Sequence, residues 1–108
     1  MHKQGTIVLT PFPFTDLSGD KVRPAVIVSD GLRGDDVVVV FVTSKLKIKD
    51  VHVVSITPEK SNGLKVVSAA VCSKIATLSK KVILGELGSL SEKDKKEVME
   101  SIKAVLGL

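Results

Sequence analysis

The sequence predicts a mainly β domain, a small barrel or sandwich with one helix docked at its C-terminal end. Short runs rich in Val and Ile recur between turn-forming residues, and such runs are typical of strands. A strong helical pattern occurs only near the end of the chain. The 108 residues, 44% of them hydrophobic, suffice for one core and are too few for two. We therefore expect a single domain over residues 1–108.

Prolines and glycines bound the expected strands. Two prolines soon after residue 10 lack amide protons, so the first strand cannot continue through both. The run 37–42 is apolar throughout, which predicts that both of its faces are covered. The segment 45–49 alternates lysine with apolar residues, as in an edge strand or an extended loop. The expected strands cover residues 6–10, 25–29, 37–42, 51–56 and 66–75.

The helix has recognisable signals at both of its ends. Ser91 is a good N-cap, and Asp94 stands at the third helical position, as in a capping box. Gly107 is placed to end the helix. The apolar stripe expected to face the sheet consists of Val98, Met99, Ile102, Val105 and Leu106.

Composition excludes several kinds of site. Cys72 is the single cysteine, so an internal disulfide and a cysteine-built zinc site are excluded. His2 and His52 are isolated from other ligands, and we expect no metal and no cofactor. No apolar run is long enough to span a membrane or resembles a signal peptide, which predicts a cytoplasmic protein. Cys72 and His52 stand in apolar strand patterns, where a structural role is the simpler interpretation.

Arg23 stands directly before Pro24 at the start of the second expected strand. Proline disfavours the helical conformation for the preceding residue, so Arg23 should be extended and fixed at the rim of the barrel. A guanidinium group binds phosphate through paired hydrogen bonds and stays charged at physiological pH. The net charge of +4 also permits an anionic partner. Position alone leaves a second interpretation open, an ordinary rim ion pair with Asp16 or Asp20.

Four segments of the chain carry a family resemblance. The first is GTIVLTPFPFTDLSGDKVRPAVIVS, which contains Pro-Phe, a glycine-containing loop and Arg-Pro-Ala in that order. The others are VVVVFVTS, NGLKVVSAAVCSKIATL and ILGELGSLSEKDKKEVMESIKAVLGL. Together, over essentially the whole chain, they resemble the MazF/PemK toxins, the ribonuclease half of type II toxin–antitoxin pairs.

The resemblance implies an SH3-like, partly open β-barrel that forms a symmetric homodimer. It implies metal-independent, sequence-specific cleavage of single-stranded RNA through attack of the 2′-OH, which inhibits translation and growth. The implied partners are single-stranded RNA and a cognate antitoxin protein. Operator DNA is an expected partner only through the antitoxin complex, and no membrane is expected.

The resemblance also assigns two catalytic residues. The essential arginine of the family falls on Arg23 and its essential threonine on Thr43, with Ser44 as the neighbour that could help to position the substrate. RNA supplies its own nucleophile, so the protein has to orient the attack, stabilise charge on the phosphoryl oxygens and move two protons. Arg23 suits the charge, and Thr43 suits a hydrogen bond to a phosphate oxygen.

The chain departs from the family at the position of the general base. Some members carry an Arg-x-Asp pair with acid and base roles where this chain has Val71 and Ser73. Neither role transfers, and Asp16 is the base candidate that we would test first. The departure keeps an alternative open, a non-catalytic toxin or binding module of the same barrel, either similar to gyrase poisons or a degenerate family member.

Candidate RNA-binding residues flank the catalytic positions. These residues are Phe14, Lys21, Lys45, Lys47 and Lys49. The last three share one side of an extended chain, where they could steer RNA or an acidic antitoxin segment. The other interpretation is a flexible edge neutralised by Asp50 and solvent. An aromatic ring, from Phe14 or Phe12, is the kind of surface on which single-stranded bases stack.

Overall fold

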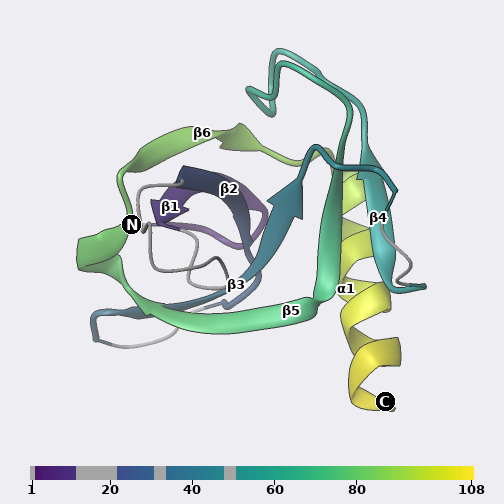
Figure 1. The fold of residues 1–108 in the computed structure, drawn as a ribbon. Helices are drawn as coiled ribbons and strands as arrows, with labels where there is room; N and C mark the ends of the chain where they lie inside the picture. Colours follow the sequence, from purple (N-terminus) through teal and green to yellow (C-terminus); the bar gives the residue numbers. More distant parts are fainter. Residues whose placement is uncertain (1, 12–21, 31–33, 48–50) are drawn as a thin grey trace.

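The computed structural model describes residues 2–11, 22–30, 34–47 and 51–108 of the chain. Its elements are β1 (Thr6–Pro11), β2 (Val22–Ile27), β3 (Asp36–Thr43), β4 (Val53–Ile56), β5 (Ser68–Ser79), the 3₁₀ turn η1 (Lys80–Val82), β6 (Gly85–Ser89) and α1 (Glu92–Leu106). The strands form one antiparallel sheet in the order β4-β5-β3-β2-β1-β6. The sheet curls on itself, and α1 lies along one side of it (Figure 1). The expectation of a partly open β-barrel with a C-terminal helix is confirmed.

Strand β3 lies inside the sheet and is covered on both faces, as its apolar run predicts. Val40 and Val42 belong to a core cluster that includes Val98 of α1. Val39 and Phe41 belong to a second cluster on the opposite face of the strand. All four side chains are almost fully buried. Alternate residues of one strand therefore supply two cores, one toward the helix and one away from it.

Strand β5 is longer than expected, and it bends. Its register with β3 shifts between Val40, which pairs with Ile75, and Phe41, which pairs with Val71. Three residues of β5 are thus inserted opposite adjacent residues of β3, and an irregularity of this kind bends a strand and increases its twist. The bend lets the first part of β5 pair with both β3 and β4, while the remainder pairs with β3. The bend contributes to the curl of the sheet.

The helix forms as its end signals predict. The Ser91 side chain accepts a hydrogen bond from the Asp94 backbone amide at 3.1 Å, and Gly107 ends the helix with φ of 75°. Val98 and Ile102 are buried against the sheet. Leu106 is 58% exposed, so its expected place in the buried stripe is wrong. The last turn of the helix extends beyond the sheet, which leaves this residue uncovered (Figure 1).

Candidate functional site

Strand β2 places Arg23 between two neighbouring strands. Arg23 is half-buried and pairs with Thr10 of β1, and Pro24 pairs with the preceding residue of that strand. The Thr10 hydroxyl is fully buried and donates to the Arg23 carbonyl at 3.4 Å. The extended conformation expected before Pro24 is confirmed by this pairing. Thr10 was missed in the sequence, where its signal is a single polar residue at the end of an apolar strand.

The other neighbour of β2 brings Thr43 toward Arg23. The β2–β3 pairing ends with Ala25 opposite Phe41, and Arg23 and Thr43 each lie two residues beyond that pair on their own strands. Thr43 is half-buried at the last position of β3. Its Oγ1 accepts a hydrogen bond from the Lys45 backbone amide at 3.0 Å, so the hydroxyl is held in place and its proton can be donated elsewhere. The two catalytic candidates thus stand on adjacent strands at one end of the sheet.

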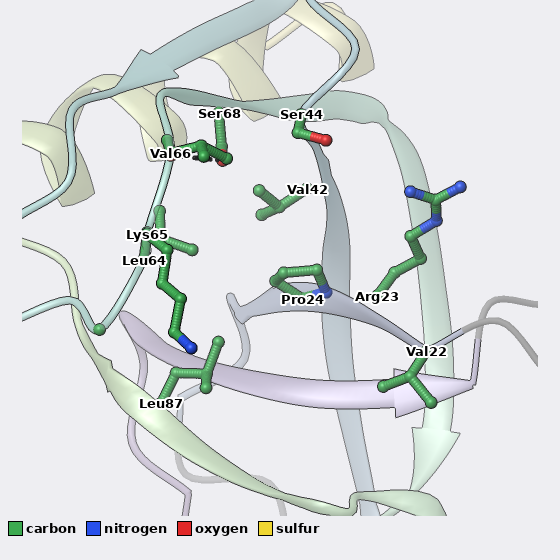
Figure 2. A pocket seen from close by; sticks show the side chains of 11 residues that line it. Val22, Arg23, Pro24, Val42, Ser44, Leu64, Lys65, Val66, Ser68 and Leu87 are labelled. Carbon is green, nitrogen blue, oxygen red and sulfur yellow. Dashed lines mark hydrogen bonds between the residues drawn. The ribbon is translucent and has the colours of Figure 1, made fainter.

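Arg23 borders a groove of about 250 Å³. Figure 2 shows Arg23 on one side, Lys65 on the other, and Val42 and Pro24 between them. Ser44, the expected neighbour of the catalytic threonine, also lines the groove, and it is exposed. The described residues that line the groove include no Asp or Glu. The groove therefore combines an apolar floor with two cationic side chains.

The wall that carries Lys65 is held tightly against β6. Asn62 is 1% exposed, and its Oδ1 accepts from the backbone amides of Glu59 at 3.1 Å and Leu64 at 3.0 Å. Its Nδ2 donates to the Thr57 carbonyl at 2.9 Å, which satisfies the buried amide. The sequence did not identify Asn62 as an anchor of the wall, because an Asn-Gly dipeptide by itself indicates only a loop.

Two glycines permit the close approach of this wall to β6. Gly63 has φ of 73°, and a Cβ there would overlap the Leu87 carbonyl. A Cβ on Gly88 would overlap the backbone of Ser61 and Asn62. The Ser89 amide also donates to the Ser61 carbonyl at 2.7 Å. Backbone therefore packs directly on backbone, which leaves the wall little freedom to move.

The remaining candidate residues divide into two groups. Lys45 and Lys47 are exposed, follow β3 outside any strand, and are not among the residues that line the groove. The loop alternative for this segment is thus the one seen over residues 45–47. The base candidate and three RNA-binding candidates lie outside the described residues and stay predictions. These four are Phe14, Asp16, Lys21 and Lys49.

Cys72 and His52, for which a structural role was expected, lie in the core and at its margin, and the positions that depart from the family pattern lie on β5. Cys72 is fully buried, and its backbone amide donates to the His52 carbonyl at 2.9 Å. His52 is half-buried and lies just before β4, not within it. Val71 is buried in β5, whereas Ser73 is exposed.

Among the described residues no group of three His, Cys, Asp or Glu side chains is placed to hold a metal ion. The described helices include none long and apolar enough to cross a membrane.

A curled antiparallel sheet with one C-terminal helix is the fold of a known class of small toxins. Residues 3–106 match the family model described as PemK-like, MazF-like toxin of type II toxin-antitoxin system. The chain belongs to this family. A comparison with curated proteins gives no match.

Solved structures share the fold over nearly the whole chain. An endoribonuclease from a Mycobacterial species, solved in complex with its cognate antitoxin, has a TM-score of 0.77 at 23% identity. The match covers 100% of this chain and 97% of the endoribonuclease chain. The Mycobacterium tuberculosis toxin MazF-mt6 has a TM-score of 0.76 at 20% identity, with coverages of 95% and 97%. MazF from Deinococcus radiodurans has a TM-score of 0.75 at 21% identity, with coverages of 98% and 96%.

Proposed function

We propose that this toxin is a metal-independent, sequence-specific endoribonuclease that cleaves single-stranded RNA and thereby inhibits translation and growth. The observation that carries the proposal is the placement of Arg23 and Thr43 near the ends of adjacent strands, with Arg23 and Ser44 lining a groove. Family membership and the endoribonuclease among the similar folds support it.

The proposed reaction uses the RNA 2′-OH as the nucleophile. Its oxygen bonds to the adjacent phosphorus, the bond from phosphorus to the 5′-oxygen breaks, and the products carry a 2′,3′-cyclic phosphate and a 5′-OH. Arg23 stabilises the negative charge that develops on the phosphoryl oxygens and can donate a hydrogen bond toward the departing 5′-oxygen, which takes its proton from water. The Thr43 hydroxyl donates to a phosphate oxygen and fixes the scissile group in line. Asp16 is the proposed acceptor of the 2′-OH proton.

Cleavage without a metal ion is the direct test of this proposal. Purified protein incubated with a long RNA in EDTA is expected to release discrete fragments with 5′-OH ends. Double-stranded RNA of the same sequence is the control and is expected to stay intact, because its bases are unavailable to the groove. An RNA left uncut under these conditions would instead favour a non-catalytic binding module.

The proposed partners are a cognate antitoxin protein and a second copy of the chain. MazF from Deinococcus radiodurans was also solved with MazE, in a complex with a TM-score of 0.72 at 22% identity. An acidic antitoxin segment would compete with RNA for Arg23 and its neighbouring lysines. Operator DNA would then be contacted only through the antitoxin complex.

A homodimer is the expected state in solution. Val22, Leu46 and Leu84 are large apolar side chains that are about half exposed in the single chain. Association of two copies would cover apolar surface that a monomer leaves in water. Sedimentation at micromolar concentration is expected to give twice the 11.5 kDa mass of one chain. A single-chain mass at that concentration would contradict the dimer.

A further inference from the structure

We infer that Asn62 is a latent deamidation site, which the fold keeps closed and whose modification releases the wall that carries Lys65 from β6. Asn62 is the only asparagine of the chain, and Gly63 follows it directly. Deamidation is fastest where glycine follows asparagine, because glycine has no side chain to obstruct the reacting backbone amide. The inference goes beyond the proposed function and does not depend on RNA binding or cleavage.

The reaction joins two groups that are neighbours along the chain. The Gly63 backbone nitrogen loses its proton and forms a bond to Cγ of Asn62. The bond from Cγ to Nδ2 then breaks, and ammonia leaves with that proton. Water opens the resulting cyclic imide at either of its two carbonyls. The products are aspartate and its β-linked isomer, so a neutral amide is replaced by a carboxylate.

The folded structure holds both reacting groups away from this reaction. The Gly63 amide donates to the Glu59 carbonyl at 3.1 Å. The Asn62 side chain accepts from the Glu59 and Leu64 amides, and it donates to the carbonyl of Thr57. Asn62 is only 1% exposed, so water is excluded from its carboxamide. The wall therefore has to open before Asn62 reacts, and the rate follows the population of the open form.

Neither product fits the place of the amide. A carboxylate cannot donate to the Thr57 carbonyl, so two acceptors face each other in a buried site. The β-linked isomer adds one atom to the main chain where space is already short, since a Cβ on Gly88 would lie 2.7 Å from the Asn62 carbonyl carbon. Modification therefore moves the wall away from β6 and prevents its return. Gly63 and Leu64 line the groove, so the change extends to it.

The first test compares deamidation of the whole chain in its folded and unfolded states. The protein is incubated at mildly alkaline pH with and without guanidinium chloride, and mass spectrometry follows the conversion of amide to acid. Peptide mapping separates Asn62 from Gln4, the single glutamine. The folded protein is expected to react at least about tenfold more slowly than the unfolded protein, because only the open form reacts. Equal rates would overturn the inference.

Gly88→Ala tests whether packing on β6 is what closes the site. An added Cβ overlaps the backbone of Ser61 and Asn62, so the substitution loosens the wall and leaves the Asn-Gly dipeptide unchanged. Deamidation of the folded variant is expected to be about tenfold faster than that of the parent. Gly85→Ala is the matched control on the same strand, because its added Cβ meets open space. It should react like the parent, and parental rates in both folded variants would contradict closure by β6. If Gly88→Ala does not fold, the comparison of the folded and unfolded parent decides.

Asn62→Asp reproduces the product of normal linkage and tests the consequence. At neutral pH it is expected to lower the Tm by about 5–10 °C, the effect of one unsatisfied buried group in a domain of this size. Lys60→Gln is the matched control, because it changes the net charge by the same amount at an exposed position of the same loop. It should keep the parental Tm. A parental Tm for Asn62→Asp would show that a carboxylate can replace the amide, which would overturn the release of the wall.

The pH dependence of this loss identifies its cause. Once protonated, the new carboxyl can again donate to the Thr57 carbonyl, so it binds its proton more tightly in the folded than in the unfolded protein. The deficit of Asn62→Asp should therefore shrink at about pH 4 and grow as the pH rises to neutrality. A deficit that is equal at both pH values would contradict the missing donor. The parent is the reference at each pH, because it shares the other charged groups of the loop and of β6, which are Glu59, Lys60, Lys65 and Glu86.

Discussion

Arg23→Ala is expected to lower the rate of RNA cleavage by about 10²–10³, the usual loss when one donor to a developing oxyanion is removed. The β2 backbone at this position is paired with β1, and the Thr10 hydroxyl binds the carbonyl of residue 23, not its side chain. The fold should therefore survive the substitution. Cleavage of a defined RNA in EDTA, measured in single turnover, gives the rate, and urea unfolding gives the stability.

Arg23→Lys is the control that separates charge from geometry. It keeps the positive charge but loses the planar pair of donors, so it is expected to leave cleavage close to the level of the alanine variant. Salt-dependent binding of uncleavable RNA should nevertheless stay near that of the parent, because the charge remains. Full cleavage by the lysine variant would contradict an arginine clamp on the scissile phosphate.

The sequence predicts the central strands well, because their short apolar runs fit buried strands. The run that becomes β3 has to be covered on both faces, and the structure covers it with two core clusters. Strand β6 was not expected, because Gly85–Ser89 has two glycines and a single apolar residue. It forms because β1 pairs with it along one edge. Tertiary pairing decides such a segment, and local propensity does not.

The candidate site was predictable on one side only. Arg23 stands out because the proline after it fixes its conformation, and the pairing of β2 with β3 then brings Thr43 near. The opposite wall had no such signal, since the charge of Lys65 resembles that of any surface lysine. Its place depends on Asn62 and on glycine contacts with β6, which are distant in the sequence. Long-range packing of this kind leaves no periodic pattern.

Gly63→Ala is expected to give the largest loss of stability among the substitutions considered, about 3–4 kcal/mol from backbone strain together with a forced displacement. Gly63 has φ of 73°, and an added Cβ would overlap the Leu87 carbonyl. Gly34→Ala is the matched control, because Gly34 has φ of 84° and open space around the added Cβ. It should lose only the left-handed strain of roughly 1–2 kcal/mol. Urea unfolding of both variants measures the difference.

The excess loss in Gly63→Ala has a consequence for the groove. The clash can be relieved only by moving the wall away from β6, and that movement changes the spacing between Lys65 and Arg23. Under conditions where Gly63→Ala is still folded, its affinity for an uncleavable single-stranded RNA should therefore fall. Gly34→Ala should bind RNA like the parent. Equal stability losses in the two glycine variants, or parental RNA binding by a folded Gly63→Ala, would show that close packing on β6 does not set the position of the wall.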